Sequence, residues 1–102
     1  MIKVQFFTND NNDVCNIIQN SITNGMEIED WIVKNIEGIS FECMDFPCDM
    51  EFCYDCYFQS NMDKLKAQEI YNMIKLSFQN ILEINFSVWV TDDILNEIYK
   101  II

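Results

Sequence analysis

The chain has 102 residues, half of them hydrophobic, and it carries seventeen acids against six lysines, with no arginine and no histidine. This length predicts one domain, and the hydrophobic content argues against disorder. A formal charge of −11 argues against DNA, RNA or an anionic membrane as a direct partner, because binding to these requires cations on the protein. It favours a protein partner with a basic surface.

The first third of the chain predicts a strand followed by a helix. Residues 2–7 are β-branched and aromatic, which is typical of a strand. The polar turn at 8–13 can cap a helix over 14–22, where apolar residues recur at helical spacing. Asn24 and Gly25 then end that helix. Cys15 lies within it, and we expect a packed or idle thiol there.

Residues 31–43 predict a hairpin. The segment 39–43 alternates apolar and polar residues, which indicates a strand, and 31–36 would be its partner across a turn at Glu37 and Gly38. A short helix over 28–36 is the alternative, because Ile28 and Ile32, among others, also fit one helical face.

The second half predicts a loop, a helix, a strand and a last helix. Residues 43–56 form the loop, and Ser60 to Asp63 resembles a capping box that opens a helix reaching Phe78. Strict alternation over 82–90 is the clearest strand pattern in the chain. Thr91 would then cap a helix to the end of the chain, with Asp92 and Asp93 in its first turn. The order β-α-β-β-(zinc loop)-α-β-α predicts a small α+β fold, an antiparallel or mixed sheet with helices packed on it.

Four cysteines are spaced C-x4-C-x4-C-x2-C inside the most acidic stretch. Thiolates gathered this closely are the ligand set of one closed, tetrahedral, structural Zn²⁺ site, and two-residue spacing lets one turn present two sulfurs to a metal. The predicted zinc ligands are Cys43, Cys48, Cys53 and Cys56. A disulfide framework and the burial of small apolar side chains remain the alternatives.

The cellular compartment bears on that choice. The first residues turn polar too soon for a signal peptide, and no apolar run approaches the ~18 residues that span a bilayer. Cys15 also leaves an odd number of cysteines. These features favour a reducing cytoplasm, in which grouped cysteines bind metal more often than each other.

A catalytic site is not expected. Four cysteines would close the coordination sphere of the metal, no histidine supplies the usual general base, and two isolated glycines cannot form a phosphate-binding loop. Instead, no cation occurs between Lys34 and Lys64, where acids and aromatic residues surround the cysteines. Aromatic anchors rimmed by charge are typical of protein interfaces. The predicted partner-binding residues are Glu42, Asp45, Asp49, Glu51, Asp55, Phe46, Phe52 and Tyr54.

In its size, acidity and cysteine quartet the chain resembles the small, very acidic anti-CRISPR proteins of phages and mobile elements that inhibit type II RNA-guided nucleases. It is similar to a zinc-bearing member, with Cys43, Cys48, Cys53 and Cys56 as matching ligands. The resemblance implies stoichiometric inhibition, in which the protein binds a basic surface of the guide-loaded nuclease in the bacterial cytosol and blocks loading of target DNA. The alternative is a non-enzymatic zinc-loop adaptor or regulatory module, and a metal or redox switch is a third reading.

Overall fold

The computed structural model describes residues 1–8, 13–45, 53–81, 83–92 and 96–101. Within them the chain forms an α+β fold, which confirms the predicted class. The elements in chain order are β1 (Ile2–Phe7), α1 (Val14–Ser21), α2 (Ile28–Asn35), β2 (Ile39–Asp45), β3 (Cys53–Ser60), α3 (Asp63–Ser77), β4 (Asn85–Thr91) and β5 (Glu97–Ile101).

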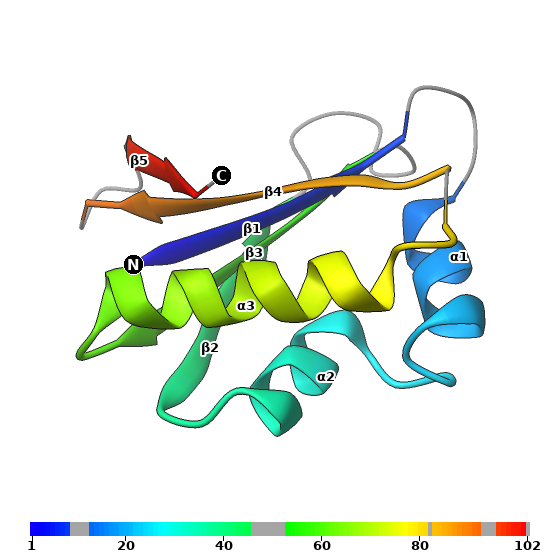
Figure 1. The fold of residues 1–102 in the computed structure, drawn as a ribbon, viewed down its shortest axis with the longest axis horizontal. Coiled ribbons are helices and arrows are strands. Elements are labelled where there is room, and N and C mark those ends of the chain that lie inside the picture. Colours follow the sequence, from blue (N-terminus) through cyan, green and yellow to red (C-terminus); the bar gives the residue numbers. More distant parts are fainter. Residues whose placement is uncertain (9–12, 46–52, 82, 93–95, 102) are drawn as a thin grey trace.

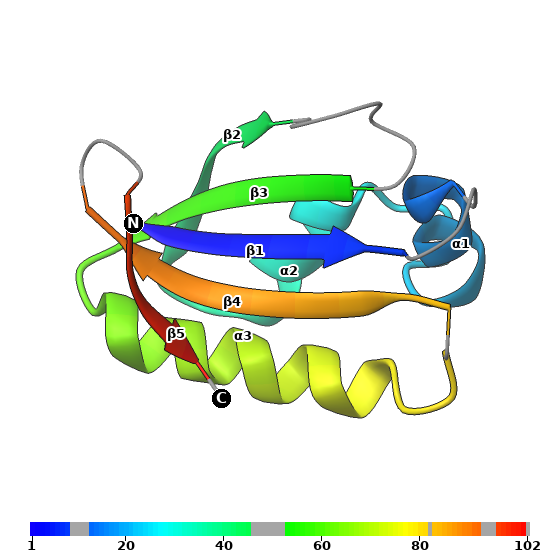
Figure 2. The same cartoon turned by 90° about the horizontal axis from the view of Figure 1, so that it is seen from above.

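The strands form one antiparallel sheet in the order β2-β3-β1-β4-β5, with the N-terminal strand in the middle (Figure 2). β1 occupies the centre because its alternate residues Ile2, Val4 and Phe6 are fully buried. Val4 lies between Cys56 of β3 and Val88 of β4, so all three side chains face the same side of the sheet.

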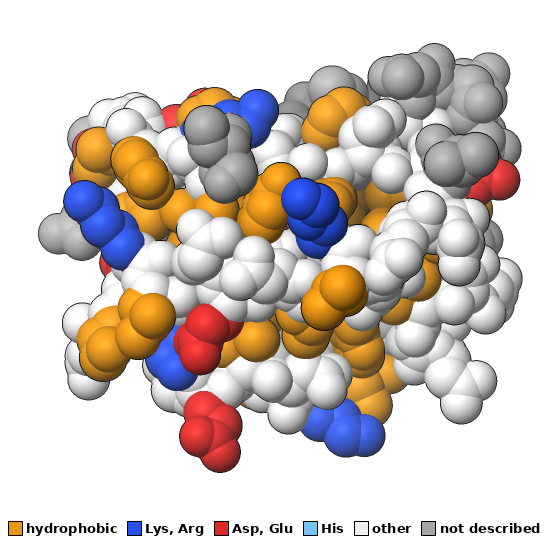
Figure 3. All heavy atoms as spheres, viewed as in Figure 1, with side chains coloured by type: hydrophobic (Ala, Val, Ile, Leu, Met, Phe, Trp, Pro, Cys, Tyr) orange, Lys and Arg blue, Asp and Glu red, His pale blue; other side chains and the backbone are white. Residues whose placement is uncertain are grey.

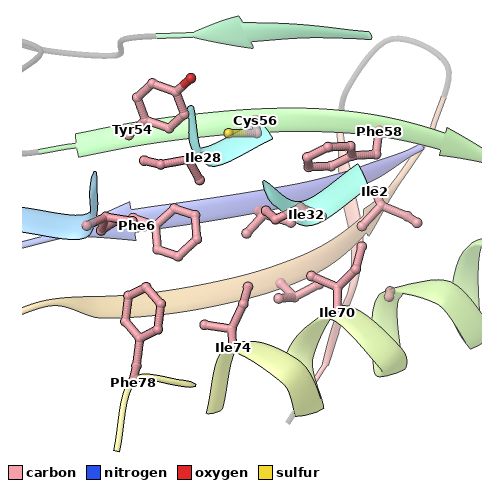
Figure 4. Close-up of a cluster of buried hydrophobic side chains, with 14 of the residues drawn as sticks. Ile2, Phe6, Ile28, Ile32, Tyr54, Cys56, Phe58, Ile70, Ile74 and Phe78 are labelled. Atoms are coloured by element: carbon pink, nitrogen blue, oxygen red, sulfur yellow. The ribbon is translucent and has the colours of Figure 1, made fainter. Parts of the chain in front are cut away.

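The helices cover that side of the sheet and leave the other side without a helix (Figure 1). α3 packs mainly on β4, α2 on β2 and α1 on β3. Figure 4 shows the resulting core, where side chains of α2 and α3 meet the inward residues of β1 and β3. Phe6 stacks on Phe78 with ring centroids 5.6 Å apart. This arrangement places two groups of elements side by side, α1, α2, β2 and β3 on one half and α3, β4 and β5 on the other.

Residues 28–35 form a helix, so the preferred hairpin over 31–36 is wrong and the alternative is right. A helix at this point buries Ile28 and Ile32 on the same side, at 1% and 0% exposure, against the sheet. The turn into β2 then needs Gly38, whose φ of +79° is a backbone conformation that other residues rarely adopt.

The C-terminal segment is also corrected, because 97–101 forms strand β5 rather than the end of a helix. β5 pairs with β4, with Val90 opposite Tyr99 and Trp89 opposite Lys100. Asp92 does accept a backbone hydrogen bond, but at the end of β4 and not at the start of a helix. Its carboxylate accepts a hydrogen bond from the backbone N–H of Asn96 at 2.8 Å, as Asp does in turns as well as at helix starts.

Of the two other predicted helix caps, one is confirmed and one is wrong. Asp13 caps α1 as the polar turn predicts, accepting a hydrogen bond from the N–H of Asn16. The capping box expected at Ser60 is absent, since α3 begins after Met62 without a side-chain cap. Ser60 instead accepts from the N–H of Met62, and the carboxylate of Asp63 lies 3.0 Å from the α-amino group of Met1.

Candidate functional site

Two of the predicted zinc ligands lie on opposite faces of the sheet. Cys53 and Cys56 both lie in β3, and residues three apart in a regular strand point to opposite faces. Cys56 points into the core, beside Ile28 in Figure 4, and is fully buried. Cys53 starts the strand on the opposite face and is partly exposed. The two-residue spacing therefore does not present two sulfurs to one point.

Cys43 is also separated from the other two, since it faces the side of the sheet opposite to Cys56 and lies far along the strands from Cys53. It is exposed on β2 and lies opposite Tyr57, four residues along β3 from Cys53, which corresponds to ~13 Å of strand. A tetrahedral zinc with Zn–S bonds of ~2.3 Å needs its sulfurs within about 4 Å of one another. Cys48 lies outside the described residues. The three described cysteines of the quartet therefore do not fit the predicted zinc site. No group of three or more potential metal ligands occurs among the described residues.

Cys15 and Cys56 pack in the core in the manner of apolar side chains. Burial, followed by the charge of Glu29, raises the pKa of Cys56 far above its usual value. Burial, with the charges of Asp13 and Glu27 among others, raises the pKa of Cys15 to about 11. The expectation of a packed thiol at Cys15 is confirmed. Because the thiolate is the reactive form, both groups are poor nucleophiles at neutral pH.

Tyr54 was predicted to contact a partner, but it is 3% exposed and holds α2 on the sheet instead. Its hydroxyl donates a hydrogen bond to Glu29, a carboxylate on α2 that is itself buried. Burial and this bond raise the pKa of Tyr54 well above its usual range. No pattern in the sequence indicates this role for Glu29, since an acid in the first turn of a helix is normally explained by the helix dipole alone.

Asp55 is likewise buried, at 2% exposure, on the face of the sheet without helices. The ammonium of Lys3 lies 3.7 Å from its carboxylate and 2.7 Å from that of Glu97. Burial lowers the pKa of Lys3, but the hydrogen bond to Glu97 and the charge of Asp55 outweigh it, so the pKa is raised. These three residues tie β1, β3 and β5 together, and Asp55 is not a surface residue available to a partner.

Of the remaining predicted contacts, Glu42 is exposed on β2. Asp45 ends β2 opposite Asp55, and its side chain is not described. Phe46, Asp49, Glu51 and Phe52 lie outside the described residues.

The fold gathers further acids around Glu42. Four exposed acids lie on or beside α1 and α2, where Lys34 is the one described cation: Asp13, Glu27, Asp30 and Glu37. In the whole sequence, residues 4–62 hold eleven acids and one lysine, a charge of −10, whereas residues 63–102 hold six acids and four lysines, a charge of −2. We call α1, α2, β2 and β3 the acidic half. The spacing of the cysteines does not indicate α1 and α2, which become neighbours of β2 and β3 only in the folded sheet.

Comparison with protein-family models, curated proteins and solved structures gave no match. The described helices include none that is long and apolar enough to cross a membrane.

Proposed function

We propose that the protein is a non-catalytic, stoichiometric inhibitor that docks its acidic half onto a basic, DNA-accepting surface of another protein. The observation that carries the proposal is the uneven charge, −10 on residues 4–62 against −2 on residues 63–102. A charge needed only for solubility has no reason to concentrate on one half of the sheet. A concentrated negative surface steers association with a positive one.

A type II CRISPR effector is the target that we propose, in line with the resemblance in size and acidity. Its DNA channel is positively charged and accepts a backbone of regularly spaced phosphates. Exposed carboxylates such as Glu37 and Glu42 offer the same sign of charge to that channel. The inhibitor would then compete with target DNA at loading, and no zinc is needed for this step.

Two charge-reversed variants with the same change in net charge test the proposal. Glu37→Lys/Glu42→Lys alters the acidic half, and Glu69→Lys/Glu83→Lys alters exposed acids of the other half. We expect the first variant to lower the association rate with the guide-loaded nuclease at least about tenfold, and the second to change it much less. The wild-type rate should also fall steeply with salt.

The competing outcomes are distinct. If both variants lose the same fraction of the association rate, only the net charge matters and the acidic half is not the docking surface. Inhibition with target DNA still bound would point to a conformational lock instead of a block at loading. If the wild-type protein binds no such nuclease, the function is wrong, and recovery of a regulatory or structural protein from a bacterial lysate would favour the adaptor.

A further inference from the structure

The edge strand β5 carries exposed apolar side chains at the end of the molecule opposite the acidic half. Among the described residues β5 pairs only with β4, so its other row of backbone N–H and C=O groups is open to a further strand. Ile98 is 66% exposed and Tyr99 49% exposed. Exposed apolar residues on an open strand edge are a site at which another strand can add.

The first turn of α3 extends this apolar surface. The ammonium of Lys64 lies 5.3 Å from the centre of the Tyr99 ring, which places this turn beside β5. Met62 and Leu65, on either side of Lys64 in the chain, are 53% and 49% exposed. Figure 3 looks onto this side of the molecule and shows hydrophobic side chains interspersed with lysines. Several exposed apolar residues gathered at one end of a molecule mark an interaction site more often than a single exposed apolar residue does.

The sequence of β5 is complementary in charge to itself. The pairing shifts between Val90 and Thr91, so that Lys100 lies opposite Trp89 and Glu97 opposite Thr91. Trp89 and Thr91 point to the same face of β4, and this bulge therefore puts Glu97 and Lys100 on one face of β5. In an antiparallel pair of β5 strands centred on Tyr99, Lys100 of each copy would lie opposite Ile98 of the other copy and one residue from its Glu97, on the same face of the strand. Two ion pairs could then form between Lys100 and Glu97, and the two Tyr99 rings would meet on the opposite face.

We propose that β5 is the interface of a symmetric homodimer, in which the occupant of the open edge is β5 of a second copy. The position of the described exposed acids supports this occupant, because two copies joined at β5 keep the exposed acids of the acidic half, such as Glu37 and Glu42, at the two far ends. The other sheet edge does not suit self-pairing, since β2 exposes Glu42 and would place like charges together. A twofold pairing of identical edges is closed and does not propagate into fibres.

Charge reversal at the two paired positions tests the dimer. In Lys100→Glu both pairs become acid against acid, and in Glu97→Lys both become lysine against lysine. We expect each variant alone to raise the dimer dissociation constant at least about tenfold in sedimentation velocity. An equimolar mixture should associate again, because every pair between the two different chains is then an acid against a lysine.

Two further measurements keep the test independent of folding. Glu97→Lys also removes the contact with Lys3, so circular dichroism must show each variant folded. Ile98→Lys changes a side chain that is already 66% exposed, and it should give a folded monomer. A wild-type protein that stays monomeric as its concentration is raised would overturn the proposal. So would folded single variants that dimerise like the wild type, or a mixture that stays monomeric.

Discussion

Removing the hydroxyl of Tyr54 should destabilise the fold although the change is one oxygen atom. The hydroxyl donates to the carboxylate of Glu29 over 2.5 Å, and the two residues are only 3% and 7% exposed. Tyr54→Phe leaves the buried carboxylate without this donor. A hydrogen bond to a charged group contributes about 1.5–3 kcal/mol, so we expect a loss of about 2 kcal/mol, or roughly 10 °C in the unfolding temperature.

Chemical denaturation of four proteins completes the measurement: wild type, Tyr54→Phe, Glu29→Leu and the double variant. The double variant should be less destabilised than the sum of the two single variants, because it buries no charge without its partner. Tyr71→Phe is the matched control. The ring of Tyr71 contacts that of Phe86, with centroids 5.3 Å apart, and this contact remains in Tyr71→Phe. The free energy of unfolding of this variant should therefore fall by less than about 0.5 kcal/mol. Additive single effects, or a Tyr54→Phe protein as stable as the control, would refute the reasoning.

The remaining predictions concern the cysteines. The pKa of Cys15 is about 11 in the folded protein against 9.0 for an ordinary thiol, so the unfolded chain releases this proton first as the pH rises. The free energy of unfolding should therefore fall between pH 9 and pH 11, and this fall should be shallower in Cys15→Ala. Denaturation at several pH values measures it, and an equal fall in the variant would contradict the raised pKa of Cys15. Cys56→Ala should cost on the order of 1–2 kcal/mol with or without a chelator, as for a core side chain. About one equivalent of zinc in the purified protein, lost in that variant, would contradict the described positions of Cys53 and Cys56.

Much of the fold could be predicted from local patterns because those patterns agree with the tertiary structure. The buried residues of β1 alternate along the strand, and β4 packs on α3, whose own apolar spacing is helical. The bounds of α1 follow from Asp13 at its start and from Asn24 and Gly25 after its end, where both backbones have positive φ. In these elements no long-range contact competes with the local preference.

The two wrong assignments are segments in which one pattern fits two structures. Residues 28–36 have apolar side chains that satisfy a helix or a strand, and the choice depends on the sheet against which Ile28 and Ile32 pack. Thr91 and Asp92 resemble a helix start, but Asp92 caps a turn equally well. Whether residues 97–101 form a helix or a strand depends on the edge of β4 with which they pair. The sequence of these residues does not reveal that edge.

The predicted zinc site requires residues 43–56 to form a loop. If that segment were a loop, spacing alone could bring four sulfurs together. Because its ends continue as the strands β2 and β3, alternation sends Cys53 and Cys56 to opposite faces and takes Tyr54 and Asp55 out of contact with solvent. Of the predicted acids, Glu42 is exposed on β2, and the acids of α1 and α2 come beside it only through the fold.

The two proposed surfaces lie at opposite ends of the sheet, and this makes them separable. A dimer joined at β5 would present two acidic halves facing away from each other, so each chain should bind one target independently. Inhibition measured per chain should then be equal for the wild type and for the monomeric Ile98→Lys variant, at one chain per nuclease. A marked loss of inhibition in the folded monomer would show that the docking surface requires both copies. Equal inhibition together with a wild-type dimer would show that dimerisation serves a purpose other than binding the target.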